Sequence, residues 1–311
     1  MKRQCEDCTL ACSKEECRFT KAKTLNSAAR VVLDGILHKS AYQHYCSLER
    51  VLGKIIQKRW YLSKCSSKKM NDLQEPVKFA GETNALKRTF IMCLGHSLSE
   101  NAAMWGLYGK SNPFALRVTI PGQVLEDWMK RIEIKEVTRF DTEKIKKAIR
   151  AMEAKDTNGR PLSKGKIQSS VFRDVLYASV AGEKKRDEYD IRRGNRVSWE
   201  KAYYNLKDRD CAIDGQYAGF IKDCEWWHEQ ESRLCIRLKK EVEDDCISIA
   251  VPKEVIASMR FTFSPWLKPS HEKHVRQILE MALNGAGVDV HETTNSQRFR
   301  RSVLQGALNF R

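Results

Sequence analysis

The sequence lacks any long apolar run, and this absence excludes one class of protein. No stretch of about 18 consecutive apolar residues occurs, so we expect no membrane-spanning helix and no membrane partner. The first twelve residues, MKRQCEDCTLAC, also lack the apolar core of an export signal. We therefore expect a cytoplasmic protein, and the 311 residues allow one large domain or two of ordinary size.

Four familiar catalytic and nucleotide-binding signatures are absent as well. The sequence contains no G-x-G-x-x-G, no Walker A motif, no H-E-x-x-H and no G-x-S-x-G. These absences argue against a Rossmann dinucleotide site, a P-loop, a zincin-type protease and an α/β-hydrolase elbow. A function has to be found in less common patterns.

Positive charge, in contrast, is abundant and unevenly distributed. The net charge is +16, with fifteen Lys and Arg against six Asp and Glu in residues 1–70 and eighteen against twelve in residues 141–210. The last fifteen residues add Arg298, Arg300, Arg301 and Arg311. A basic periphery suits a polyanionic partner, nucleic acid above all, although a basic surface that serves solubility alone explains it about as well.

The N-terminal cysteines form the second concentrated feature. Four of the eleven cysteines have the spacing C-x2-C-x3-C-x4-C, which can surround one tetrahedral structural zinc ion: Cys5, Cys8, Cys12 and Cys17. A metal-free cysteine-rich arm explains the run about as well, and its spacing matches no common iron–sulfur cluster. We therefore divide the chain into a Cys-rich element at 1–24 and a larger domain at 25–311.

Hydrophobic periodicity predicts an α+β fold for the larger domain. A basic, mainly helical insertion is expected at about 125–222, with one strand at 175–180. Helices are predicted at 26–39, 48–60, 97–109, 252–258 and 271–287. Strands are predicted at 60–67, 88–97, 114–120, 232–238, 246–252, 258–265 and 288–293, the second of them central because it is apolar throughout.

The stretch CEWWHEQESRLCIRL, residues 224–238, places two carboxylates before an alternating apolar run. If the segment is extended, Glu229 and Glu231 share one face because successive side chains alternate. Like charges this close raise one another's pKa, so the pair is costly unless it is solvated or bound. Taken alone, solvated charge at a strand end is the better interpretation, just as Trp105 and Tyr108 alone are better interpreted as core.

The order of several short blocks changes that interpretation. YQHYCSLE (42–49), WYLS (60–63), NDLQE (71–75), FIMCLGHS (90–97), NAAMWGLYG (101–109) and WHEQESRL (227–234) follow one another. This order resembles the bacterial family known as domain of unknown function 2971. Its members run approximately Y-x-Y-x-S, L-N-D-P-x-E, C-x-S, N-x-x-M-W-x-x-Y and W-x-x-E-x-E-x-R-L. The resemblance covers about residues 42–290, with Leu73 in place of the usual proline and a longer, more basic 125–222 region.

The same pattern resembles, more distantly, the ADP-ribosyltransferase fold of toxins and phage-defence proteins, with its split mixed or antiparallel β core. That resemblance implies NAD as co-substrate, Glu231 as the catalytic glutamate and Glu229 facing the acceptor. It further implies an aromatic and polar wall around the dinucleotide. His44 would contact the adenosine ribose, and the other residues implied are Tyr45, Tyr61, Ser63, Trp105 and Tyr108.

The chemistry implied by the resemblance is physically consistent. Cleavage of the nicotinamide–ribose bond develops positive charge on the ribose, which a fixed carboxylate stabilises more than it stabilises the ground state. A second carboxylate two residues earlier can act as general base toward the acceptor.

The resemblance therefore predicts an ADP-ribosyltransferase whose acceptor is a macromolecule, with RNA or DNA favoured by the basic ends. A neutralising antitoxin or chaperone protein is the partner expected of such a toxin. Two alternatives stay open. One is a non-catalytic nucleic-acid or nucleotide-binding module of the same fold, and the other is an interaction domain held together by zinc.

Overall fold

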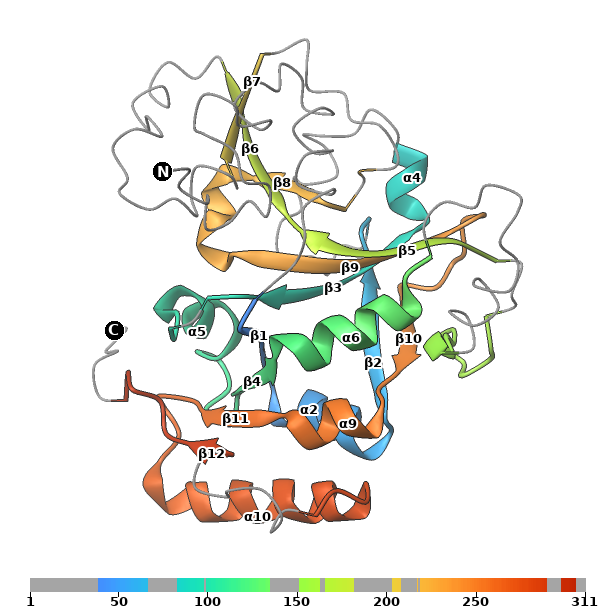
Figure 1. The fold of residues 1–311 in the computed structure, drawn as a ribbon. Helices are drawn as coiled ribbons and strands as arrows, with labels where there is room; N and C mark the ends of the chain where they lie inside the picture. The colour runs from blue at the N-terminus through green and yellow to red at the C-terminus, as the bar shows by residue number, and fades with distance from the viewer. Residues whose placement is uncertain are drawn as a thin grey trace, which may run out of the picture.

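The computed structural model describes residues 39–66, 83–97, 99–134, 151–162, 166–181, 203–207, 217, 219–289 and 298–305. In these ranges the chain is α+β with a mainly antiparallel sheet, so the predicted fold class is confirmed at that level (Figure 1). No helix in the same ranges has both the length and the apolar character that a bilayer crossing requires.

The main sheet comprises nine strands within the described residues. Seven of them are neighbours in the order β10 (Cys246–Ala250), β2 (Arg59–Lys64), β3 (Thr89–Gly95), β1 (Ala41–Cys46), β4 (Leu116–Pro121), β11 (Arg260–Phe263) and β12 (Phe299–Arg300). β9 (Glu231–Leu238) pairs with β3, and β5 (Ile167–Asp174) pairs with β9. All neighbours are antiparallel except β11 and β12.

β3 is the central strand, as its unbroken apolar sequence predicts. One edge pairs with β9 over the whole strand, from Thr89 opposite Arg237 to Gly95 opposite Glu231. The other edge is shared, because β2 pairs with β3 at Phe90 and Ile91 while β1 pairs with it at Gly95. The sheet therefore splits along this edge of β3, with β1 and β2 leaving it at opposite ends.

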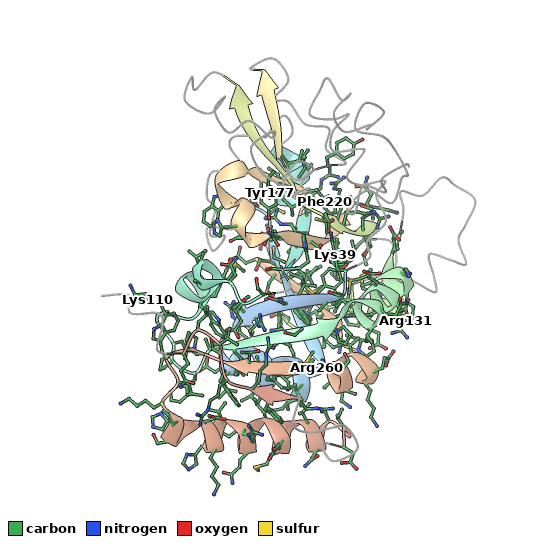
Figure 2. All side chains as sticks on the ribbon, turned by 60° about the vertical axis from the view of Figure 1, so that its left-hand side comes forward. Lys39, Lys110, Arg131, Tyr177, Phe220 and Arg260 are labelled. Atoms are coloured by element: carbon green, nitrogen blue, oxygen red, sulfur yellow. The ribbon has the colours of Figure 1, made fainter. Side chains whose placement is uncertain are left out.

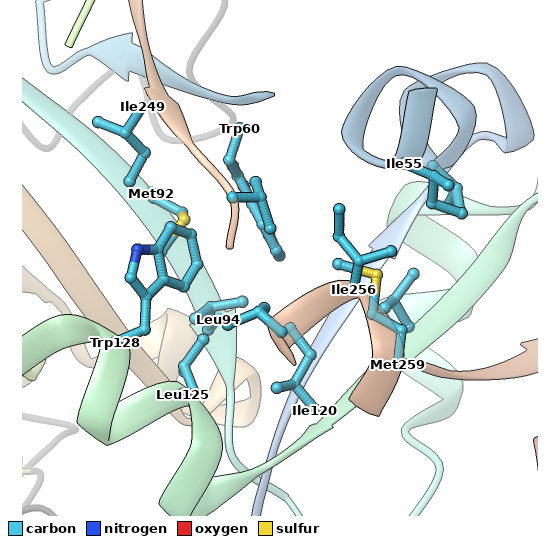
Figure 3. Packing of buried hydrophobic residues seen from close by; sticks show 14 of the residues in the cluster. Ile55, Trp60, Met92, Leu94, Ile120, Leu125, Trp128, Ile249, Ile256 and Met259 are labelled. Carbon is cyan, nitrogen blue, oxygen red and sulfur yellow. The ribbon is translucent and has the colours of Figure 1, made fainter. Parts of the chain in front are cut away.

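The hydrophobic core lies on one face of this sheet. Four helices cover that face: α2 (Leu48–Ile56), α6 (Gly122–Ile132), α9 (Lys253–Ser258) and α10 (Pro269–Gly285). Trp60 and Trp128 pack with ring centroids 6.3 Å apart in the close view of Figure 3. Each large apolar side chain buried here contributes about 1.5–3 kcal/mol. The spacing of apolar residues in 48–60 predicts that Ile56 faces the core with Val51 and Ile55, but Ile56 is 63% exposed at the C-terminal end of α2.

The opposite face carries different elements. α5 (Ala102–Tyr108) and α4 (Thr83–Lys87) lie on it. A second, parallel sheet has the order β7 (Tyr203–Lys207), β6 (Leu176–Ala181) and β8 (Ile221–Asp223), and the short 3-10 helix η5 (Cys224–Glu229) leads from β8 toward β9. In Figure 1 this second sheet lies above β9, away from α10.

The described part of the 125–222 region corrects one expectation. It was expected to be mainly helical with a single strand, yet after α6 it supplies β5, β6, β7 and most of β8. β5, whose sequence is IQSSVFRD, was missed because its apolar residues are few and separated by polar ones. Seven register pairs with β9 order it all the same, so tertiary pairing decides its conformation.

Several boundaries also differ from expectation. The helix expected at 97–109 begins only at Ala102, where Asn101 caps α5, and Gly109 ends it as predicted. The last strand is β12, which was not predicted, and residues 288–289 of the expected strand at 288–293 are not in a strand. The predicted helix at 26–39 lies outside the described residues, apart from Lys39. The four N-terminal cysteines lie outside them as well, so the zinc site stays a prediction.

Candidate active site

Strand pairing and a single turn bring the two predicted catalytic carboxylates together. Glu231 is the first residue of β9 and lies opposite Gly95 of β3, while Glu229 is the last residue of η5. Gln230 between them has a φ of 44°, and its carbonyl accepts from the backbone N–H of His96 at 2.9 Å. The sequence predicted that both glutamates lie in one extended segment, and this prediction is wrong. A left-handed turn at Gln230 redirects Glu229.

A lysine on β8 bridges the two carboxylates. Lys222 Nζ lies 2.5 Å from Glu229 Oε2 and 3.7 Å from Glu231 Oε2. Arg233, two residues along β9, reaches the same Glu231 Oε2 through its NH2 at 2.9 Å and its Nε at 3.0 Å. The four residues are each at most 4% exposed. Two acids and two bases thus form one buried cluster, which is neutral when both carboxylates are ionised.

Surrounding groups fix the cluster in place. Arg233 NH1 donates to the carbonyl of Gly219 at 2.9 Å, and the backbone N–H of Glu231 donates to the hydroxyl of Tyr177 at 2.9 Å. Lys222 Nζ lies 4.5 Å from the ring centroid of Trp226, a cation–π contact. Figure 2 labels Tyr177 beside Phe220 on this side of β9. These contacts hold the side chains of Arg233 and Lys222 and the backbone of Glu231 in one arrangement.

The environment moves the two carboxyl pKa values in opposite directions. Burial, followed by the charge of Glu231, raises the pKa of Glu229 to about 7, although Lys222 opposes the shift. Burial would raise the pKa of Glu231 too, but Arg233 and Lys222 together outweigh it and hold that pKa well below its usual range. Near neutral pH Glu231 is therefore ionised, while Glu229 can take up and release a proton.

α5 contributes the third predicted member of the cluster. The Tyr108 hydroxyl donates to Glu229 Oε1 at 3.3 Å. Asn101 positions this helix relative to η5, because its Oδ1 accepts from the N–H groups of Ala103 and Met104 while its Nδ2 donates to the carbonyl of His228 at 2.6 Å. One side chain thus caps the helix that carries Tyr108 and binds the residue that precedes Glu229.

His44 does not join these residues. It shares the core face of the sheet with Tyr42, its ring centroid lies 5.2 Å from that of Trp60, and its Nδ1 lies 3.2 Å from the Cys93 carbonyl. Burial, followed by the charge of Lys54, lowers the pKa of His44 to about 3, so the ring is neutral. The sheet itself separates His44 from Glu231, because their side chains leave it on opposite faces.

Two more predicted residues lie away from the cluster. Ser63 is opposite Ile91, four residues before Gly95 on β3, which corresponds to about 13 Å along the strand. Tyr61 is 52% exposed and donates its hydroxyl to Gln57 at 3.0 Å. The expected wall around a dinucleotide is therefore not assembled from these two side chains beside Glu231.

Tyr45 of β1 and Trp105 of α5 pack against each other where α5 meets the sheet. Their ring centroids are 4.9 Å apart in an edge-to-face contact, and the backbone N–H of Asn101 donates to the Tyr45 hydroxyl at 3.1 Å. Both are buried and pack with Met104 and Ala115. They support the helix that presents Tyr108, which is the core role that their spacing favours when taken alone.

Sequence reasoning missed five members of the site. No role was assigned from the sequence to Lys222, Tyr177, Asn101, Arg233 or Cys93, whose thiol hydrogen-bonds Glu231. Lys222 carries one readable signal: it lies in the short run FIKD, seven residues before Glu229, as a charge inside an apolar stretch. The others become visible only through strand pairing.

Comparisons with protein-family models, with curated proteins and with solved structures found no match to this chain. Within the described ranges, no group of three or more His, Cys, Asp or Glu side chains is arranged to hold a metal ion.

Proposed function

We propose that this chain is an ADP-ribosyltransferase that cleaves NAD and transfers ADP-ribose to a macromolecular acceptor, with RNA as the favoured acceptor. One observation carries the proposal: Glu229 and Glu231 share a buried cluster with Tyr108 in which one carboxylate stays ionised and the other titrates near pH 7. Carboxylates with pKa values moved apart in this way suit two different chemical roles.

The arrangement of strands supports the proposed ADP-ribosyltransferase-like fold and the resemblance to domain of unknown function 2971. β1 and β2 leave the same edge of β3 at opposite ends, which is a split β core. In line with that resemblance, we propose that the protein acts in bacteria as a toxin or phage-defence effector, with a neutralising protein as its partner.

In the proposed reaction the two glutamates act at different atoms. The bond between the ribose C1′ and the nicotinamide nitrogen breaks, and nicotinamide leaves with the electron pair. Glu231 stabilises the positive charge that develops on the ribose. Glu229 in its ionised form accepts the proton of the acceptor nucleophile as the new bond to C1′ forms.

The residues fit one part of NAD better than the other. Glu231 and Tyr108 suit the nicotinamide ribose, since both belong to one cluster. Glu231 supplies an ionised carboxylate, and Tyr108 supplies an aromatic hydroxyl that is bonded to Glu229. The adenosine contact expected of His44 does not fit, because His44 lies on the core face against Trp60. The proposal therefore gives His44 no role in binding NAD.

A second candidate function is a non-catalytic nucleic-acid or nucleotide-binding module, and the charge balance of the cluster favours it. Glu231 is 4% exposed and its charge is matched by Arg233. A buried and neutralised carboxylate is also what a purely structural ion pair looks like. Under this alternative the chain binds its ligand without consuming NAD.

The deciding experiment measures nicotinamide release and the transfer of adenylate-labelled ADP-ribose to RNA, DNA and cell protein. We expect the wild-type full chain to transfer label, Glu231→Gln to lose at least about 100-fold of both activities, and Glu229→Gln to lose transfer more than NAD cleavage. Circular dichroism and thermal melts establish that each variant is folded.

Two matched variants serve as controls. Glu254→Gln removes an exposed carboxylate paired with Arg131 at 2.6 Å, and His44→Gln changes the opposite face of the sheet; both should keep NAD turnover. Equal label transfer by folded wild type and Glu231→Gln would overturn the role of Glu231. No NAD consumption with any acceptor would favour the binding module.

A further inference from the structure

Three arginines surround one threonine on the face of the sheet that also carries Glu231. Thr262 of β11 lies directly opposite Arg117 of β4 and directly opposite Arg300 of β12. Arg260 precedes Thr262 by two residues on the same strand, so its side chain leaves the same face. The reverse face of these strands is apolar, with Val118, Phe261 and Phe299 in the core. We call Arg117, Arg260, Thr262 and Arg300 the arginine face.

The arginine face has an excess of donors over acceptors. Arg117 NH2 at 3.4 Å and Arg300 Nε at 2.9 Å both donate to the same neutral oxygen, Thr262 Oγ1. Arg117 is 1% exposed, its NH1 reaches the neutral Gln43 Oε1 at 3.4 Å, and its Nε has no hydrogen-bond partner. A buried guanidinium with neutral partners only is costly, since its charge is removed from water without compensation.

Nearby carboxylates do not neutralise these arginines. Among the described residues no ion pair includes any of the three. Glu272 is bound by Arg276 and Arg301, and Glu100 accepts from Trp105 Nε1, Ser302 Oγ and the backbone N–H of Val303. Charges of one sign on neighbouring strands repel one another, and a bound anion would reduce that repulsion.

The arginine face lies on the same face of the sheet as the candidate active site. One row of directly paired residues crosses five strands in the order Glu231, Gly95, Gln43, Thr119 and Arg260. Four strand spacings separate the ends of this row, or about 19 Å. The row places Arg260 and Glu231 on one face of the sheet, while Gln43 and Gly95 between them are buried.

We infer that the arginine face binds the phosphate backbone of a nucleic acid, on the same face of the sheet as the glutamate cluster. Guanidinium groups suit phosphate because they donate two parallel hydrogen bonds. Exposed Arg260, which Figure 2 labels on β11, and exposed Arg300 contact phosphates, while buried Arg117 adds positive potential behind Thr262. The inference rests on the proposed function only for the identity of the acceptor, because binding needs no NAD.

The test is equilibrium binding of fluorescein-labelled 20-nucleotide RNA and DNA single strands to the full chain without NAD, across a salt series. We expect Arg260→Gln/Arg300→Gln to weaken binding roughly tenfold and to reduce the slope of log K against log salt by about 1.4, since each contact with a single strand contributes about 0.7. The RNA and DNA arms distinguish the two sources of phosphate backbone.

The matched control is Lys130→Gln/Arg131→Gln, which removes the same charge from exposed positions on α6 and should change binding by less than about twofold. Equal losses in both double variants, or no binding by the wild type, would overturn the arginine face. Displacement of RNA by polyglutamate at equal charge concentration would point instead to an acidic protein partner. A chain that binds RNA through these arginines but consumes no NAD refutes only the proposed function.

Discussion

The two faces of the main sheet have opposite chemistry although the same strands build both. On one face Trp60, Met92 and Leu234 join an apolar core beneath α2, α6, α9 and α10, and the one imidazole there, His44, is kept neutral. On the other face Glu231 and Arg233 form a buried ion pair, and arginines continue across β4, β11 and β12.

The difference shows that burial alone does not decide what a buried ionisable group does. His44 and Glu231 are both shielded from water, but one loses its charge and the other keeps it. Glu231 has a guanidinium 2.9 Å away, whereas the charge that most affects the pKa of His44 is Lys54, which has the same sign as a protonated imidazole. The partner, rather than the degree of burial, sets the charge state.

The largest expected effect on stability comes from removing Arg233, the ion-pair partner of Glu231. Arg233→Met should lower the free energy of unfolding by about 3–5 kcal/mol, because it leaves a buried carboxylate with only Lys222 at 3.7 Å. Urea denaturation measures the change. Glu231→Gln/Arg233→Met should recover much of the loss. The control is Arg260→Met, which changes an exposed arginine on the same face. An Arg233→Met variant as stable as this control would contradict the prediction.

Glu229 should make the protein less stable as pH rises. Its pKa is about 7 when folded and about 4.5 when unfolded, so the folded chain holds the extra proton between these values and rising pH favours unfolding. Between pH 4.5 and 8, Glu229→Gln should therefore gain about 3 kcal/mol relative to wild type. Chemical denaturation at a series of pH values tests this, and a difference that does not vary with pH would refute it.

His44 should show the opposite pH dependence on the core face. Its pKa is about 3 when folded and near 6.5 when unfolded, so the unfolded chain binds the proton first and stability falls as pH drops below 6.5. At pH 5 the wild type should have lost up to about 2 kcal/mol relative to His44→Gln. The same pH series measures it. The transition due to Glu229 should be unchanged in His44→Gln, and a shifted transition would show that the two faces are coupled.

The smallest effect concerns the link between α5 and η5. Asn101→Ala removes both the cap and the bond to the His228 carbonyl and should cost about 1–2 kcal/mol, whereas Asn101→Asp keeps the cap and loses only the Nδ2 donor. Both should move the pH transition of Glu229, since Tyr108 is then held less firmly against it. If Asn101→Asp leaves this transition unchanged, Asn101 has only a capping role.

Much of the secondary structure could be predicted because it depends on local pattern. The apolar run at β3, the alternation in β9 and the helical stripe of α2 each follow from a single segment. β5 could not be predicted from its own residues, since its conformation depends on pairing with β9. The site was predicted in part: Glu229, Glu231 and Tyr108 lie together, whereas His44 and Ser63 do not join them.

Local sequence alone thus establishes that this chain has a basic, α+β character and two closely spaced glutamates ahead of a strand. Only the tertiary structure decides what surrounds those glutamates. The register of β3 against β9 puts Arg233 and Cys93 on the face of Glu231, and the same alternation puts His44 on the other face. The reason is physical: a change of one residue in register reverses the face of every side chain on a strand, and no segment encodes its own register.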